Sequence, residues 1–280
     1  MDHLRRLHRP QLRSPRALLA WEGWNDACDA ASGAAGYLLA RLDEPEPFAV
    51  IEPEEFYDFQ VRRPQVTIDK GGTRRLSWPL TKAFAVPTAD RDLVLVMGEE
   101  PNLRWKTYTR TVAGLLAESD VDRVVTLGAF VGQVAHTLPV PIVGVATDPS
   151  LVAAHGLLTS RYEGPTGIVG VMLEACREVG IPAVSLWAAT PHYLAANPNP
   201  KAMLALLSAA APLLDVEFEL AEMEQMAAEF ESQVDAAMAD NAEFVGYVRR
   251  LEEAGEGPID PLRSAEMIGE IEEFLRRTRG

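Results

Sequence analysis

Short runs of apolar residues alternate with helical patterns along most of the 280-residue chain. Six of these runs lack polar alternation, which is typical of strands buried on both faces of a sheet. They are Ala17–Trp21, Phe48–Ile51, Leu93–Met97, Val124–Leu127, Ile142–Ala146 and Ala183–Trp187. Helical patterns follow at Ala27–Leu42, Trp105–Ser119, Thr166–Val179 and Pro200–Leu207. Repeated strand–helix units predict an α/β fold, with a largely parallel sheet between two layers of helices.

The segment between the second and third runs has a different pattern. Within residues 54–86, the stretches EFYDFQVRR, QVTIDKGGTRRLSW and TKAFAV are typical of antiparallel strands. Lys70-Gly71-Gly72-Thr73 supplies the turn between two of them. We therefore expect a mixed sheet, open or partly closed, rather than a purely parallel one.

From Val216 onward, apolar and small side chains recur at strict four–three spacing, which is typical of a coiled-coil seam. The seam consists of Met223, Ala227, Phe230, Val234, Ala237, Asn241, Phe244, Val248 and Leu251. A break at residues 255–258 precedes a second pattern, in which Ser264 can cap a helix containing Ile268, Ile271 and Leu275. We predict an α/β core of residues 1–215 and an antiparallel helical hairpin of residues 216–280. The seam is expected to pack on the body or within an oligomer.

Charge and cysteine content restrict the classes of partner. The net charge of −15 is concentrated in residues 216–280, which hold 17 acidic and 6 basic side chains. Such a field repels phosphate backbones, so general nucleic-acid binding is not expected. No apolar run approaches the roughly 20 residues that a bilayer span requires, and the N-terminus lacks the apolar stretch of a signal peptide. Cys28 and Cys176 are far apart in the sequence, as expected for reduced thiols in the cytoplasm.

Polar, aromatic and glycine residues gather in the loops that follow the predicted strands. Ligands of open α/β sheets bind outside the carboxyl ends of the strands, so we expect these loops to line one crevice. The ligand-binding candidates are Trp24, Asn25, Asp26, Glu100, His136, Gly164, Thr166, Gly167 and His192. Thr147 and Asp148, which follow another predicted strand, are expected at the same edge.

Each candidate also has a structural interpretation. Asn25 or Asp26 can cap the following helix, and the two histidines can be satisfied by backbone groups. Gly164 to Gly167 open a helix whose free amides suit an anion, yet a proline and glycines also make an ordinary helix start. The histidines and cysteines lack zinc-site spacing, and no serine has the context of a hydrolase nucleophile. We therefore assign no catalytic residue, metal or cofactor from the residues alone.

Five motifs in this order resemble the proteasome assembly chaperone 2 family, most closely its prokaryotic, actinobacterial-type branch. They are Gly23-Trp24-Asn25-Asp26-Ala27, Gly98-Glu99-Glu100-Pro101, His136-Thr137, Tyr162-x-Gly164-Pro165-Thr166-Gly167 and Ser185-Leu186-Trp187-Ala188-Ala189-Thr190-Pro191-His192-Tyr193. The similarity covers roughly residues 15–210, and the acidic helix beyond it is similar to an extension of actinobacterial-type members. The resemblance implies a three-layer α/β/α fold related to purine nucleoside phosphorylases and a tendency to self-assemble. Cys28 stands where the family often has a small residue.

For eukaryotic relatives the resemblance implies chaperoning of proteasome α-subunit rings. Members that dock on proteasomes can end in a hydrophobic–Tyr–any-residue tail, whereas this chain ends Arg276-Arg277-Thr278-Arg279-Gly280. Docking by that route is therefore not expected. We rank an assembly-chaperone-like or scaffold protein that self-associates first, and a protein binding a nucleoside- or phosphate-like ligand second. An enzyme ranks third, because fold analogy does not transfer activity.

Overall fold

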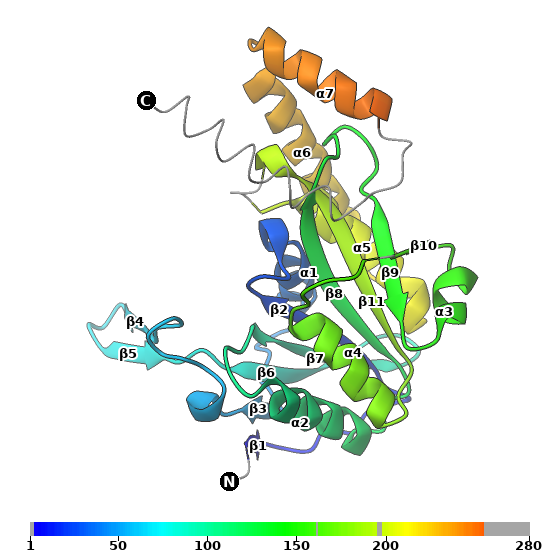
Figure 1. Cartoon of the computed structure of the whole chain (residues 1–280). Coiled ribbons are helices and arrows are strands. Elements are labelled where there is room, and N and C mark those ends of the chain that lie inside the picture. The colour runs from blue at the N-terminus through cyan, green and yellow to red at the C-terminus, as the bar shows by residue number, and fades with distance from the viewer. Residues whose placement is uncertain (1–2, 161, 195–197, 255–280) are drawn as a thin grey trace.

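The computed structural model describes residues 3–160, 162–194 and 198–254 of the chain. Within these residues, a nine-stranded sheet in the order β1-β3-β6-β7-β2-β8-β11-β9-β10 forms the centre of the molecule (Figure 1). Its strands are β1 (Leu4–Arg6), β2 (Arg16–Glu22), β3 (Ala49–Ile51), β6 (Thr81–Pro87), β7 (Asp92–Glu99), β8 (Val124–Gly132), β9 (Ile142–Ala146), β10 (Leu158–Thr159) and β11 (Ala183–Pro191). All six predicted apolar runs therefore contribute strands to one sheet.

The strand directions confirm a mixed sheet with a parallel centre. The four central strands β7, β2, β8 and β11 are parallel, whereas β6, β3 and β1 extend the sheet with antiparallel pairs. On the other side, β9 is antiparallel to β11 and pairs Ala146 with Val184 near the start of β11. The carboxyl end of β9 therefore lies at the opposite edge from those of its neighbours.

Helices cover both faces of the sheet, because alternate residues of the central strands face opposite sides. In β2, Ala17, Leu19 and Trp21 join a core cluster with α2 (Trp105–Glu118) and α4 (Ile168–Glu178). Leu18 and Ala20 join a second cluster with α1 (Ala30–Leu39) and α5 (Pro200–Leu214). The short elements η1 (Ala27–Asp29), η2 (Pro53–Glu55), α3 (Pro149–Ala154) and η3 (His192–Leu194) lie in the connections. The two helical layers form because the central strands are apolar on both faces, and each face has to be buried against helices.

The antiparallel segment is only partly as predicted. Strands β4 (Gln65–Ile68) and β5 (Arg74–Ser77) form a separate two-stranded hairpin, and Gly72 adopts a φ of 80° in its turn. The expected strand over residues 55–63 is wrong. Phe56 and Tyr57 are consecutive and both buried, which a strand with one exposed face does not allow, and the carbonyl of Phe56 accepts from the amides of Asn102 and Leu103.

The C-terminal seam divides into two helices, α6 (Ala221–Met238) and α7 (Ala242–Ala254). The single helix expected to run through residue 241 is wrong, because the side chain of Asn241 accepts a hydrogen bond from the amide of Phe244 and caps α7. Several seam positions are buried, namely Met223, Ala227, Val234, Val248 and Leu251, whereas Ala237 and Asn241 are exposed. The predicted break at residues 255–258 and the helix with Ile268, Ile271 and Leu275 lie outside the described residues.

Candidate functional site

Asn25, Glu100 and Gly167 meet where β2, β7 and the start of α4 converge. The amide nitrogen of the fully buried Asn25 side chain donates to Glu100 Oε1 at 2.7 Å, and the backbone amide of Ile168 donates to the same oxygen at 2.8 Å. A Cβ on Gly167 would lie 2.2 Å from Asn25 Oδ1, so only glycine fits there. Glu100 thus places a carboxylate of the chain itself at the N-terminus of α4, where a free anion would otherwise bind.

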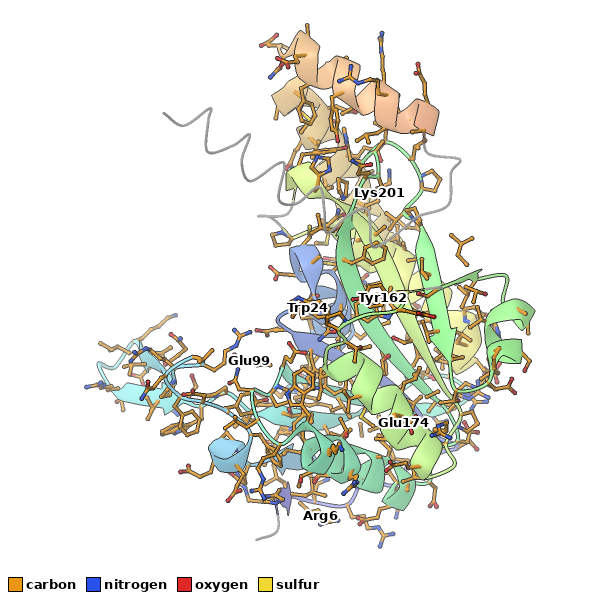
Figure 2. The ribbon with its side chains drawn as sticks, viewed as in Figure 1. Arg6, Trp24, Glu99, Tyr162, Glu174 and Lys201 are labelled. Carbon is orange, nitrogen blue, oxygen red and sulfur yellow. The ribbon has the colours of Figure 1, made fainter. Side chains whose placement is uncertain are left out.

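The turn that presents Asn25 depends on Gly23, whose φ of 124° is unfavourable for residues with a side chain. A Cβ on Gly23 would also lie 3.1 Å from the Cβ of Glu100. The Asn25 carbonyl accepts from the amide of Ala129 in β8 at 2.8 Å, which fixes the turn to the sheet. Trp24, which lies between Gly23 and Asn25 in the sequence, is 65% exposed (Figure 2). The motif Gly23-Trp24-Asn25-Asp26-Ala27, which follows β2, therefore buries its asparagine and exposes its tryptophan to solvent.

Asp26 caps α1, the helix that follows it. Its Oδ1 accepts from the backbone amides of Ala31 at 2.6 Å and Ser32 at 3.2 Å, in the first turn of α1. Burial raises the pKa of the Asp26 carboxyl above its usual value, while these hydrogen bonds oppose that shift. Oδ1 is therefore a structural cap of α1, whereas Oδ2 is buried and has no hydrogen-bond partner among the described residues.

The two candidate histidines contact the C-terminal helices. His136 is buried, with Nδ1 at 2.8 Å from the Tyr193 hydroxyl and Nε2 at 3.0 Å from Asp235 Oδ1 of α6. His192 Nε2 lies 3.2 Å from the hydroxyl of Tyr247 in α7. The ring of Tyr193 packs edge-on against both histidines. The imidazoles therefore connect the strand ends to α6 and α7.

Further polar contacts attach these helices to the same edge of the sheet. Lys201, at the start of α5, donates to the carbonyl of His136 at 2.6 Å and forms an ion pair with Glu231 (Figure 2). The Thr137 hydroxyl donates to Glu252 Oε1 at 2.5 Å. An apolar cluster of Ala135, Val248 and Leu251, with Phe244 and Tyr247 beside it, fills the space between.

The nine candidates thus fall into two groups, which contact different parts of the chain. Asn25, Asp26, Glu100 and Gly167 form one, with Trp24, Gly164 and Thr166 exposed beside it; His136 and His192 form the other. The cavity beside His136, Lys201 and Phe230 measures about 10 Å³, room for about one water molecule, whereas ligand pockets occupy roughly 300 Å³ or more. Thr147 and Asp148 are not at this edge, because β9 is reversed. The amide of Thr147 donates to the carbonyl of Ala183 at the beginning of β11.

The pKa of His192 leads to a prediction about pH. Burial lowers this pKa below its usual value. The folded state then binds the proton less readily than the unfolded state, whose histidine pKa is about 6.5. The contribution of neutral His192 to the free energy of unfolding is therefore complete above about pH 6.5, and it is lost as the pH falls toward the lowered pKa of the folded state. We expect the melting temperature of the wild-type protein to fall more between pH 7.5 and 5.5 than that of His192→Asn. An equal fall in melting temperature in the two proteins would contradict a lowered pKa of His192.

Sequence reasoning missed the residues that hold the histidines. Asp235 and Tyr247 belong to segments in which only the apolar seam was considered, and neither has a local signal that points to a distant imidazole. Tyr193 was visible as part of the last motif, but only the fold places its hydroxyl between His136 and α7. Across the described residues, no group of three or more His, Cys, Asp or Glu side chains is arranged to hold a metal ion.

The sequence model of the PAC2 family matches residues 20–238, which include the motifs around Asn25, Glu100, His136 and His192. The chain belongs to the PAC2 family. Comparison with curated proteins gave no match. Among the helices that the structure describes, none is both long and apolar enough to span a membrane.

Solved structures of this family from actinobacteria resemble the chain over most of its length. A PAC2 family protein from Streptomyces avermitilis is 46% identical, with a TM-score of 0.77, over 84% of this chain and 99% of that one. A proteasome-assembly chaperone homologue from Mycobacterium tuberculosis is 42% identical, with a TM-score of 0.76, over 83% and 99%. An archaeal proteasome activator from Pyrococcus furiosus is 19% identical, with a TM-score of 0.64, over 85% and 99%, and shares the fold. The actinobacterial resemblance predicted from the motifs is confirmed.

Proposed function

We propose that this PAC2 family protein is an assembly-chaperone-like scaffold that acts in the cytoplasm through protein–protein contacts and associates with itself. The observation that carries the proposal is that side chains of the protein itself contact the carboxyl ends of the central strands. Glu100 lies at the start of α4, and α6 and α7 contact His136 and His192. A catalyst needs a site open to its substrate, whereas a scaffold needs only an outer surface.

The relatives support a protein partner connected with proteasomes. The M. tuberculosis relative is described as a proteasome-assembly chaperone homologue, and the P. furiosus neighbour as a proteasome activator. We infer that a proteasome-related protein is a partner of this chain and that the folded surface makes the contact. We also infer an α/β core of residues 1–215 related to purine nucleoside phosphorylases and an extension of residues 216–280 with coiled-coil character.

The test for a partner is to mix the purified protein with unassembled proteasome α-type subunits of its source organism. We expect mixed complexes, or faster assembly of α-subunit rings, measured by native mass spectrometry over time. Bovine serum albumin at the same concentration controls for crowding. Unchanged assembly without a mixed species would contradict the proteasome-related part of the proposal.

The competing function is catalysis or ligand binding at the strand ends. We expect no release of base from a panel of purine and pyrimidine nucleosides, with or without phosphate. Cleavage of a glycosidic bond needs stabilisation of an oxocarbenium-like sugar and a donor at the leaving base, and Asn25 and Glu100 already bind within the protein. Turnover that is lost in both Glu100→Gln and Asn25→Ala would overturn the proposal and establish an active site here.

A further inference from the structure

The β4–β5 hairpin has an apolar face that lies open to solvent. The register pairs Val66 with Leu76 and Ile68 with Arg74, so these side chains share one face, and Trp78 follows Leu76 on it. Val66, Ile68, Leu76 and Trp78 are 43%, 71%, 52% and 43% exposed. The opposite face carries Gln65, Thr67, Arg75 and Ser77. This is the pattern of a sheet that buries one side, yet every residue from 65 to 78 is exposed.

The hairpin is also too small to be stable on its own. A two-stranded hairpin is at best marginally stable in water and normally needs a third strand or a packed helix. Within the described residues, it forms a sheet separate from the main one, and Figure 1 shows it extending away from the helical layers. Trp78 has an edge-on contact with Phe59, at 4.7 Å between ring centroids, and still exposes 43% of its surface. A clustered exposed face of this kind marks an interaction surface.

The charge of the hairpin identifies the kind of surface that fits it. Residues 61–78 contain five basic side chains and one acidic one, in a chain whose net charge is −15. By contrast, residues 216–254, which contain α6 and α7 and are called the arm below, hold eleven acidic and two basic side chains. Two hairpins packed face to face would bring like charges together, whereas the hairpin and the helical arm are complementary.

The arm offers a matching patch on the solvent side of α6. Glu222, Met226 and Glu229 are spaced four and three residues apart and therefore share a helix face. All three are exposed, and Met226, which exposes 40% of its surface, supplies an adaptable apolar contact between two carboxylates. Glu222 also forms an ion pair with Arg41 of its own chain, at 3.3 Å. Figure 1 shows the hairpin and the arm at separate parts of the molecule, so the hairpin does not contact the arm of its own chain.

We propose that the β4–β5 hairpin of one copy docks its apolar face on the Glu222–Met226–Glu229 patch of a second copy. Arg74 and Lys70 of the hairpin then face the carboxylates of the patch, and Ile68, Leu76 and Trp78 are buried against Met226 and the neighbouring helix surface. Two such contacts related by a twofold axis would close a dimer, and a head-to-tail arrangement would close a ring. The inference deepens the proposed function and rests on its self-association.

The test is a charge exchange read out by sedimentation equilibrium over a range of protein concentrations. We expect the wild-type protein to associate. Lys70→Glu with Arg74→Glu should weaken association by about ten-fold or more, and Glu222→Lys with Glu229→Lys should do the same, because each places like charges together. Combining all four substitutions in one chain should restore association, since the signs are again complementary. Ile68→Ser with Leu76→Ser should weaken it without a change of charge.

The matched control is Lys106→Glu with Arg110→Glu, which changes the net charge equally on the exposed side of α2 and should leave association unchanged. These substitutions lie outside the core, and circular dichroism checks that each variant is folded. A wild-type protein that stays a single chain at high concentration would overturn the inference, as would association indifferent to the hairpin. Sensitivity to the hairpin but not to the arm would also overturn it. None of these results depends on the nucleoside assay, so failure here is distinguishable from catalysis at the strand ends.

Discussion

Replacing Met223 with aspartate is expected to lower the melting temperature by about 10 °C. Met223 is 1% exposed and belongs to the core cluster formed by α1, α5 and the sheet, although it lies in the helical arm. A charge placed there without a partner costs roughly 3–5 kcal/mol. For a chain of this size each kcal/mol corresponds to about 2–4 °C. Thermal unfolding followed by circular dichroism measures the change.

The control for Met223→Asp is Ala228→Asp, which adds the same charge to an exposed position of the same helix. Its cost should be below about 1 kcal/mol, the difference in helix propensity between alanine and aspartate. If both variants melt like the wild-type protein, α6 does not pack on the body and the arm is an independent appendage. A large loss in Met223→Asp alone shows that the arm is part of the folding unit.

Replacing Gly167 with alanine is expected to cost about 2–4 kcal/mol, or roughly 5–10 °C in melting temperature. The backbone φ of −92° suits alanine, so the cost comes from contact with Asn25, whose Oδ1 would lie 2.2 Å and Nδ2 2.5 Å from the new Cβ. Moving Asn25 breaks its hydrogen bond to Glu100 and the packing of a fully buried amide.

Gly36→Ala is the matched control for Gly167→Ala. Gly36 lies within α1, and a Cβ there would meet no atom within 4 Å. Alanine should stabilise that helix by about 0.5–1 kcal/mol, because it loses less conformational entropy on folding than glycine. Opposite signs for the two glycine substitutions are therefore expected in the same thermal assay. A neutral Gly167→Ala would show that the contact between Asn25 and the start of α4 is loose.

Local sequence determined the strands and helices of the body. Unbroken apolar runs such as Leu93–Met97 predict buried strands because both faces need apolar cover, and the helical patterns between them predict the two outer layers. The Gly71-Gly72 turn of the hairpin was equally visible, since few other residues adopt a φ of 80°. Five short motifs in order also identified the family, although each motif alone is weak.

Only the tertiary structure decided how these pieces meet. The run Ile142–Ala146 predicts a strand but not its direction, and its reversal against β11 moved Thr147 to the other edge. Asn241 fits a seam by spacing, yet its side chain caps α7. The carboxyl ends of β2, β7, β8 and β11 lie at one edge, as predicted. Whether they form an open crevice depends on Glu100, Asp235 and Tyr247, which contact them from segments far away in sequence. Periodicity records which face of an element is buried, whereas contacts between distant segments depend on packing that no local pattern contains.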